Sequence, residues 1–226
     1  MEGYANSYKF ADELFKQLNR GDIVVTGNGT AYTCTYQAMK VKEGVRVFAN
    51  QGCASMGYGL PASIGACVSN TTGKTICVTG DGSIQMNLQE LQTLVTYKMP
   101  LKVFVIENES YLAIKTTQTS FFHGHFTGSN PTSGVVCPDM KKVSAAYGIP
   151  FFRVSDNESL ESVIKEVLNM DGPVICEIKM HPMQTLFPKS ASFMDKETGK
   201  MSSAPLEKMA PFMDEELQAE CVYKAK

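Results

Sequence analysis

The chain has 226 residues, a formal net charge of −2, 43% hydrophobic residues and 19% charged residues. This balance excludes a disordered chain, and the lack of a dense Lys or Arg run argues against nucleic-acid or membrane-surface partners. No stretch reaches the roughly 18 apolar residues that a membrane span needs, and the polar N-terminus does not resemble a signal peptide. We therefore expect a cytoplasmic protein.

Short apolar runs alternate with amphipathic stretches along the chain. In chain order, we predict helix Tyr8–Leu18, strand Ile23–Thr26, strand Arg46–Ala49, helix Leu60–Val68, strand Thr75–Thr79, helix Asn87–Tyr97, strand Leu101–Ile106, helix Asp139–Tyr147, strand Phe151–Val154, helix Ser159–Leu168 and strand Val174–Lys179. Most strands are continuous apolar runs, which is typical of strands buried on both faces of a parallel sheet. The alternation predicts an α/β fold with a doubly wound, mostly parallel six-stranded sheet and helices on both faces.

Two segments lack this periodicity. Phe121–Pro138 is rich in Gly, Ser, Thr, Asn and Pro, so we predict a long loop there. After Pro182 the regular pattern fades. We therefore predict one domain over residues 1–182 and an extended C-terminal tail over residues 183–226, which lies over the domain or over a partner.

A Gly-Asp-Gly-Ser turn, Gly80-Asp81-Gly82-Ser83, follows the strand Thr75–Thr79. Its glycines let the backbone approach a ligand closely, and backbone N–H groups at the following helix start favour an anion. The Asp81 carboxylate would repel that anion unless a hard cation lies between them. Mg²⁺ suits such a position because it binds protein carboxylates together with phosphate oxygens. An ordinary Asp-Gly turn at a strand end is the alternative.

Asn108 follows the next strand, 27 residues beyond Asp81, since 108 − 81 = 27. One helix and one strand fit between the two residues, which makes a βαβ unit. Asp81 and Asn108 would then lie at the carboxyl ends of two parallel strands, where ligands bind in such sheets. If those strands are neighbours, the two side-chain oxygens can reach one ion.

Together these residues resemble the diphosphate-binding motif of thiamine-diphosphate enzymes. The segments Gly80–Leu91 and Gly52–Ala62 look like the diphosphate-side, C-terminal domain of the acetolactate-synthase-like family, and the resemblance extends from about residue 8 to 182. Residues 111–118, then 121 and 122, depart from true acetolactate synthases. That segment and residues 205–212 look more like relatives found with polysaccharide or modified-sugar biosynthesis.

The resemblance implies thiamine diphosphate and Mg²⁺ as cofactors. Asp81 and Asn108 would bind Mg²⁺ through their side chains, and Ser110 through its backbone carbonyl. Gly82 and Ser83 would bind the diphosphate through backbone N–H groups. The other residues that the family match places around the cofactor are Gly29, Thr30, Ala31, Ala54, Ser55, Met56, Gly80, Tyr111 and Leu112.

Five of these residues have more specific implied roles. The small residues Gly29, Thr30 and Ala31 would hold the outer phosphate in place of the usual Gln and His side chains. Ala54 and Met56 would face the aminopyrimidine, and Met56 would be the apolar wedge that bends the cofactor. In a helix start of this kind, a Met that only fills the core is the alternative.

In this superfamily, the glutamate that activates the cofactor comes from a separate pyrimidine-binding domain. Glu90 and Glu107 are poor substitutes, because both belong to the diphosphate side. The chain is therefore expected to need a pyrimidine-side subunit or domain, in a homo- or hetero-oligomer, to act on a small 2-oxo acid by decarboxylation or carboligation. It would be a subunit of a split enzyme, a piece of a longer enzyme, or a chain that has lost catalysis.

Two other functions stay open. One is a non-catalytic module that holds the cofactor or a partner. The other is the β-subunit of a 2-oxoacid:ferredoxin oxidoreductase, although none of the seven cysteines forms the C-x-x-C pair typical of a cluster site.

Some polar residues outside the motif are further candidates. His123 and His125 form a His-x-His pair that is a possible metal or substrate contact, with the third histidine at His181. Lys115 and Gln118 share a helical face and are candidates to contact a carboxylate or a sugar hydroxyl. A solvated helix face is the alternative for that pair.

Overall fold

The computed structural model describes residues 3–190, 192–194, 198–205 and 207–221. The chain divides into two compact units, Met1–Gln184 and Thr185–Lys226. No helix among the described residues is long and apolar enough to cross a membrane. The described residues leave out residues 1–2 of the predicted domain and residues 191, 195–197, 206 and 222–226 of the predicted tail.

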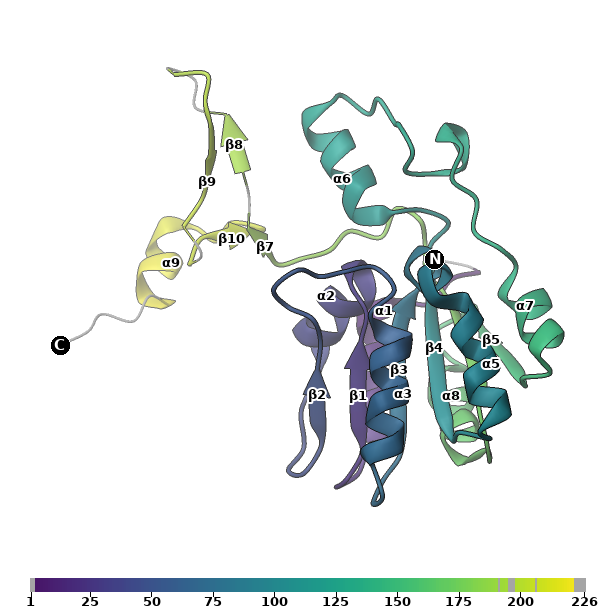
Figure 1. The fold of residues 1–226 in the computed structure, drawn as a ribbon. Coiled ribbons are helices and arrows are strands. Elements are labelled where there is room, and N and C mark those ends of the chain that lie inside the picture. Colours follow the sequence, from purple (N-terminus) through teal and green to yellow (C-terminus); the bar gives the residue numbers. More distant parts are fainter. Residues whose placement is uncertain (1–2, 191, 195–197, 206, 222–226) are drawn as a thin grey trace. The chain divides into compact units, whose positions relative to one another are not determined.

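A six-stranded sheet forms the centre of the first unit (Figure 1). Its strands are β1 (Ile23–Thr26), β2 (Arg46–Phe48), β3 (Thr75–Gly80), β4 (Leu101–Glu107), β5 (Phe151–Val154) and β6 (Val174–Lys179). They lie in the order β2-β1-β3-β4-β6-β5, and every pair is parallel. The chain builds outward from β1 to β2, then crosses back to β3 and builds in the other direction, which is the doubly wound topology predicted from the sequence.

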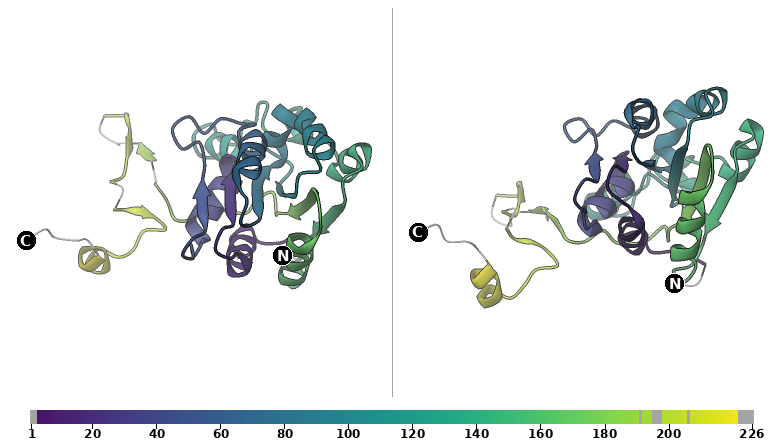
Figure 2. Two further views of the ribbon diagram at one scale, coloured as in Figure 1. Left: turned by 60° about the horizontal axis from the view of Figure 1, so that its bottom comes forward. Right: turned by 90° about the horizontal axis from the view of Figure 1, so that it is seen from below.

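Helices cover both faces of this sheet (Figure 2). On one face, α1 (Ser7–Gln17) packs against α2 (Gly29–Ala38) and α8 (Leu160–Asn169). On the other face lie α3 (Gly59–Ser69), α5 (Leu91–Thr96) and α7 (Met140–Tyr147), whose apolar side chains share one buried cluster with β3 and β4. The α/β fold class is therefore confirmed.

Strand β4 shows why a continuous apolar run predicts a central strand. Successive side chains of a strand point to opposite faces, so a strand covered on both sides needs apolar residues on both faces. Val103 and Val105 join the cluster beneath α3, α5 and α7, whereas Phe104 faces the other way. The Phe104 ring lies 5.3 Å from that of Phe10 on α1.

The helix predicted at Asn87–Tyr97 differs in the structure. The chain forms α4 (Asp81–Ile84) and a 3₁₀ segment, η1 (Gln85–Glu90), before α5 begins at Leu91. Asn87 leaves the helical region with φ −139°, and its side-chain amide donates a 2.7 Å hydrogen bond to the carbonyl of Gly57. A tertiary contact therefore holds the first residue of the predicted helix outside the helical region, and the first turn of that helix is 3₁₀.

Helix α2 was not among the predicted helices. Its sequence, GTAYTCTYQA, is rich in Thr and Tyr, which have weak helix propensity, and it has no apolar stripe at helical spacing. Between β4 and α7 the chain forms α6 (Leu112–Phe121) and a loop that contains the short η2 (Pro131–Ser133). Figure 1 shows α6, in teal, beyond the carboxyl ends of the strands.

The second unit contains short antiparallel strand pairs where an extended tail was predicted. Strand β7 (Lys189–Ser190) pairs with β10 (Met209–Ala210), β8 (Ser192–Met194) pairs with β9 (Met201–Ser203), and α9 spans Glu215–Cys221. Strands of two or three residues are too short to produce a recognisable alternation in the sequence. Among the side chains described in this unit, only Ala204 is buried.

Candidate functional site

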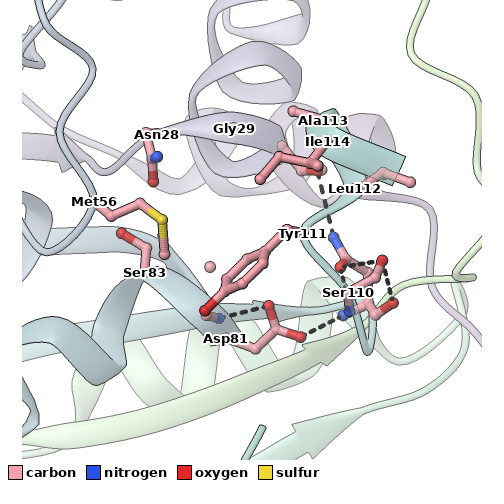
Figure 3. A pocket seen from close by; sticks show the side chains of 14 residues that line it. Asn28, Gly29, Met56, Asp81, Ser83, Ser110, Tyr111, Leu112, Ala113 and Ile114 are labelled. Atoms are coloured by element: carbon pink, nitrogen blue, oxygen red, sulfur yellow. Dashed lines mark hydrogen bonds between the residues drawn. The ribbon is translucent and has the colours of Figure 1, made fainter. Parts of the chain in front are cut away.

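A pocket opens at the carboxyl ends of β3 and β4 (Figure 3). These strands are neighbours, and Gly80 pairs with Ile106 in register. Asp81 and Asn108 therefore lie just beyond the same edge of the sheet, as their spacing predicted. The residues that line the pocket come from β1–α2, β3–α4, β4–α6 and the loop before α3: Asn28, Gly29, Thr30, Met56, Gly80, Asp81, Gly82, Ser83, Asn108, Ser110, Tyr111, Leu112, Ala113 and Ile114.

Asp81 is the only acidic residue among those that line the pocket. Its carboxylate is buried and accepts backbone N–H bonds from Gly82 at 2.8 Å, Asn108 at 3.1 Å and Glu109 at 3.0 Å. Glu109 adopts φ +57°, a left-handed conformation uncommon for a residue with a side chain. Burial raises the pKa of Asp81 to about 6, although these N–H bonds act in the opposite direction.

The Asn108 side chain links Ser110 with Thr30. Its Oδ1 accepts hydrogen bonds from the Ser110 backbone N–H at 3.2 Å and the Ser110 hydroxyl at 3.3 Å. Its Nδ2 donates to Thr30 Oγ1, at 3.4 Å, in the first turn of α2. These bonds hold the Asn108 amide oxygen next to the Ser110 backbone. Asn108, Ser110 and Thr30 are all buried.

Three helices, α2, α4 and α6, begin at the pocket, and none has a hydrogen bond from the side chain of its cap residue. The cap residues are Asn28 for α2, Gly80 for α4 and Tyr111 for α6. The first N–H groups of a helix have no partner within the helix and carry the positive end of its dipole. Uncapped helix starts facing one pocket favour an anion with several oxygens, such as a diphosphate, although the Gly82 N–H at the α4 start already donates to Asp81.

Met56 is held in the pocket by the residue that follows it. Gly57 adopts φ +82°, its N–H donates to Ser83 Oγ at 3.0 Å, and its carbonyl accepts the amide of Asn87. A side chain on Gly57 would come within 2.7 Å of Asn87 Nδ2 and of Met86 Cβ. The loop before α3 is thus docked onto the Gly-Asp-Gly-Ser turn, and this docking positions Met56.

The oxygen atoms at this site suit Mg²⁺. One buried carboxylate, one amide oxygen and the backbone around Ser110 are hard ligands, and Mg²⁺ prefers oxygen and retains water or phosphate oxygens in its coordination sphere. A cation beside Asp81 would favour its charged form and offset the effect of burial. Among the described residues, no group of three or more His, Cys, Asp or Glu side chains could hold a metal ion elsewhere.

Most of the residues predicted to surround the cofactor lie together in this pocket, but three do not line it. Ala31 is buried inside α2, and Ala54 and Ser55 are exposed on the loop before Met56. Three lining residues were not predicted, namely Asn28, Ala113 and Ile114. Each lies within two residues of a predicted residue, so continuity along the helix start was the signal that could have identified them.

The two glutamates considered from the sequence, Glu90 and Glu107, do not line the pocket. Glu90 accepts a hydrogen bond from Thr93, and Glu107 lies 3.6 Å from the ammonium group of Lys179. Burial raises the pKa of Glu107 to about 7. Among the described residues, no glutamate lines the pocket.

The other polar candidates are engaged elsewhere. Lys115 is buried and donates to the carbonyl of Pro182 at 3.0 Å, and the Gln118 side chain bonds to the loop after α6. His123 and His125 are exposed in that loop. Neither pair lines the pocket.

Comparison with known proteins agrees with the geometry. The family model for the thiamine pyrophosphate enzyme, C-terminal TPP binding domain, matches residues 27–178. The acetolactate synthase large subunit of Porphyra purpurea is 34% identical over 175 residues, which cover 77% of this chain and 29% of that protein. That of Cyanidium caldarium is 35% identical over 155 residues, covering 69% of this chain and 26% of that protein.

A bacterial relative gives the same picture. Acetolactate synthase isozyme 2 large subunit of Escherichia coli (strain K12) is 28% identical over 183 residues, covering 79% of this chain and 33% of that protein. The chain thus spans about three-tenths of the length of the curated relatives that it matches. It belongs to the thiamine pyrophosphate enzymes and carries their C-terminal, cofactor-binding domain, with similarity to acetolactate synthase large subunits.

Proposed function

We propose that this chain is the diphosphate-binding half of an enzyme that uses thiamine diphosphate and Mg²⁺ to decarboxylate a small 2-oxo acid, to ligate the resulting fragment, or both. The observation that carries the proposal is the convergence of uncapped helix starts and an all-oxygen ligand set in one pocket. A diphosphate bridged to Mg²⁺ satisfies both features at once.

Each wall of the pocket has a role in this proposal. Asp81, Asn108 and the Ser110 carbonyl hold the cation. The α4 start, at Gly82 and Ser83, holds the diphosphate together with the α2 start. The other residues proposed to contact the cofactor are Gly29, Thr30, Ala31, Ala54, Ser55, Met56, Gly80, Tyr111 and Leu112. Bound thiamine diphosphate supplies the electron sink for the carbanion formed from a 2-oxo acid.

The activating glutamate belongs, in this proposal, to a pyrimidine-side subunit or domain. Support comes from the pocket, which no described glutamate lines, and from the curated relatives, of which this chain spans about three-tenths. We propose that residues 1–182 bind the cofactor, that residues 183–226 form a C-terminal extension, and that the complete enzyme is a homo- or hetero-oligomer in the cytoplasm.

Calorimetric titration of the chain with thiamine diphosphate, with and without Mg²⁺, tests the cofactor site. We expect binding that needs Mg²⁺ and that disappears when EDTA removes it. Asp81→Ala should abolish this binding, whereas Glu166→Ala, an exposed carboxylate on α8, should leave it unchanged. Equal binding by the Asp81→Ala variant would refute the metal site.

Activity is tested with the partner present. A pyrimidine-side chain carrying a strand-end glutamate is mixed with this chain, thiamine diphosphate and Mg²⁺, and CO₂ release from pyruvate and other 2-oxo acids is measured. We expect release only when both chains are present, and none after removal of the partner's glutamate. Cofactor binding without turnover of any 2-oxo acid would instead indicate the non-catalytic module.

A further inference from the structure

Gln118 on α6 has a side chain whose polar atoms are all engaged by the loop that follows the helix. Its Nε2 donates to the carbonyl of Thr127 at 2.9 Å. Its Oε1 accepts the Ser129 hydroxyl at 2.7 Å and the Thr127 N–H at 3.4 Å. The half-buried Gln118 side chain loses conformational entropy in forming these three contacts. The contacts fix the segment from Thr127 to Ser129 against α6.

Ser129 links the Gln118 side chain to the backbone at the start of α6. It is fully buried, and its backbone N–H donates to Ser133 Oγ at 3.0 Å. Its carbonyl accepts the backbone N–H of Tyr111 at 2.9 Å. Ser129 is therefore bonded at its side chain to Gln118 and at its backbone to Tyr111.

Tyr111 is the residue of this chain of contacts that reaches the pocket. Figure 3 shows its ring projecting between Asp81 and Met56. The ring packs so closely on Gly82 that any side chain at position 82 would collide with it. Gly82 belongs to the turn that is proposed to hold the diphosphate, so the placement of Tyr111 determines the shape of that part of the pocket.

We infer that Gln118 is a positioning residue for the cofactor site, which acts through Ser129 to hold Tyr111 as a wall of the pocket. This role rests on the proposed function, because it assumes that the pocket binds the cofactor. Gln118 itself does not line the pocket. Its effect on the cofactor is therefore indirect and depends on the loop contacts.

Titration of the full chain with thiamine diphosphate at saturating Mg²⁺ measures this effect. Gln118→Ala loses the contacts to Thr127 and Ser129, and we expect affinity to fall by about tenfold, as for one or two lost hydrogen bonds. Gln118→Glu retains the acceptor for Ser129 but loses the donor to Thr127, so its affinity should lie in between. Thr117→Ala is the matched control, because Thr117 bonds only to the Ala113 carbonyl within the same helix.

A second readout follows the contact itself. Hydrogen exchange of the Tyr111 amide, measured without cofactor, should become faster in Gln118→Ala and stay unchanged in Thr117→Ala, while the central-strand amide of Val105 exchanges as before. Unchanged cofactor affinity in Gln118→Ala, or unchanged Tyr111 exchange, would overturn the inference. A wild-type chain that does not bind the cofactor would instead overturn the proposed function, and this role with it.

Discussion

Each edge of the sheet holds an asparagine, and the two asparagines have different partners. At the amino edge, Asn70 donates from its side chain to the carbonyls of Gly21, Gly73 and Lys74, each at 3.2 Å. At the carboxyl edge, Asn108 accepts through its oxygen from Ser110. In a parallel α/β sheet, helices end at the amino edge and expose carbonyls, whereas they begin at the carboxyl edge and expose N–H groups.

Lys102 is a second side-chain donor to backbone carbonyls at the amino edge. It is buried at the start of β4, and its ammonium group donates to the carbonyls of Met170 at 2.5 Å and Gly172 at 2.7 Å, just beyond the end of α8. The exposed carbonyls of that edge are thus matched by donors within the chain. At the carboxyl edge the first turn of α2 receives no side-chain cap, which supports the proposal of an anion site at that edge.

The largest expected effect is that of Asp81→Asn on cofactor affinity. The change removes the one carboxylate of the proposed Mg²⁺ site, and we expect thiamine diphosphate to bind at least about a hundredfold more weakly, because a charged ligand contact is lost. The unfolding free energy should change by less than about 1 kcal/mol, since neutralising a buried carboxylate offsets the loss of one N–H contact. Calorimetry measures the first quantity and urea denaturation the second.

Lys102→Met should lower the unfolding free energy and leave cofactor affinity unchanged. Two carbonyls beyond α8 lose a charged donor, and the methionine fills most of the lysine volume, so we expect a loss of about 2 kcal/mol of stability. Cofactor affinity of the folded chain should be unchanged. A weakened cofactor affinity in Lys102→Met, at concentrations of urea where the chain is folded, would contradict the separation of the two edges.

Asn108 and Asn70 allow the same comparison of the two edges, with smaller expected effects. Asn108→Ala removes a proposed Mg²⁺ ligand and the contact to Thr30, and we expect cofactor affinity to fall by about tenfold or more. Asn70→Ala removes donors to three carbonyls and should destabilise the fold by about 1–2 kcal/mol with affinity unchanged. Paired titration and denaturation of both variants checks this, and the opposite assignment of effects would refute it.

The sequence predicted the sheet well because every central strand, such as β4, is an apolar run whose burial on both faces leaves little choice of structure. It also predicted Asp81 and Asn108 as a pair, because one helix and one strand separate them. It did not predict α2, whose Thr and Tyr residues become helical through packing against α1. The 3₁₀ turn at the start of the predicted helix Asn87–Tyr97 was also missed, because Asn87 is held by Gly57, which is distant in sequence.

The smallest expected effect concerns the two asparagines that precede helices. Asn6 caps α1 and accepts the N–H groups of Tyr8 at 2.9 Å and Lys9 at 3.2 Å, whereas Asn28 makes no such bond at the start of α2. Asn6→Ala should therefore cost about 1 kcal/mol of stability, and Asn28→Ala less than about 0.5 kcal/mol. Urea denaturation of both variants measures the difference. A comparable loss in Asn28→Ala would mean that its side chain caps α2 in solution, and the N–H groups of that helix would then be unavailable for the anion.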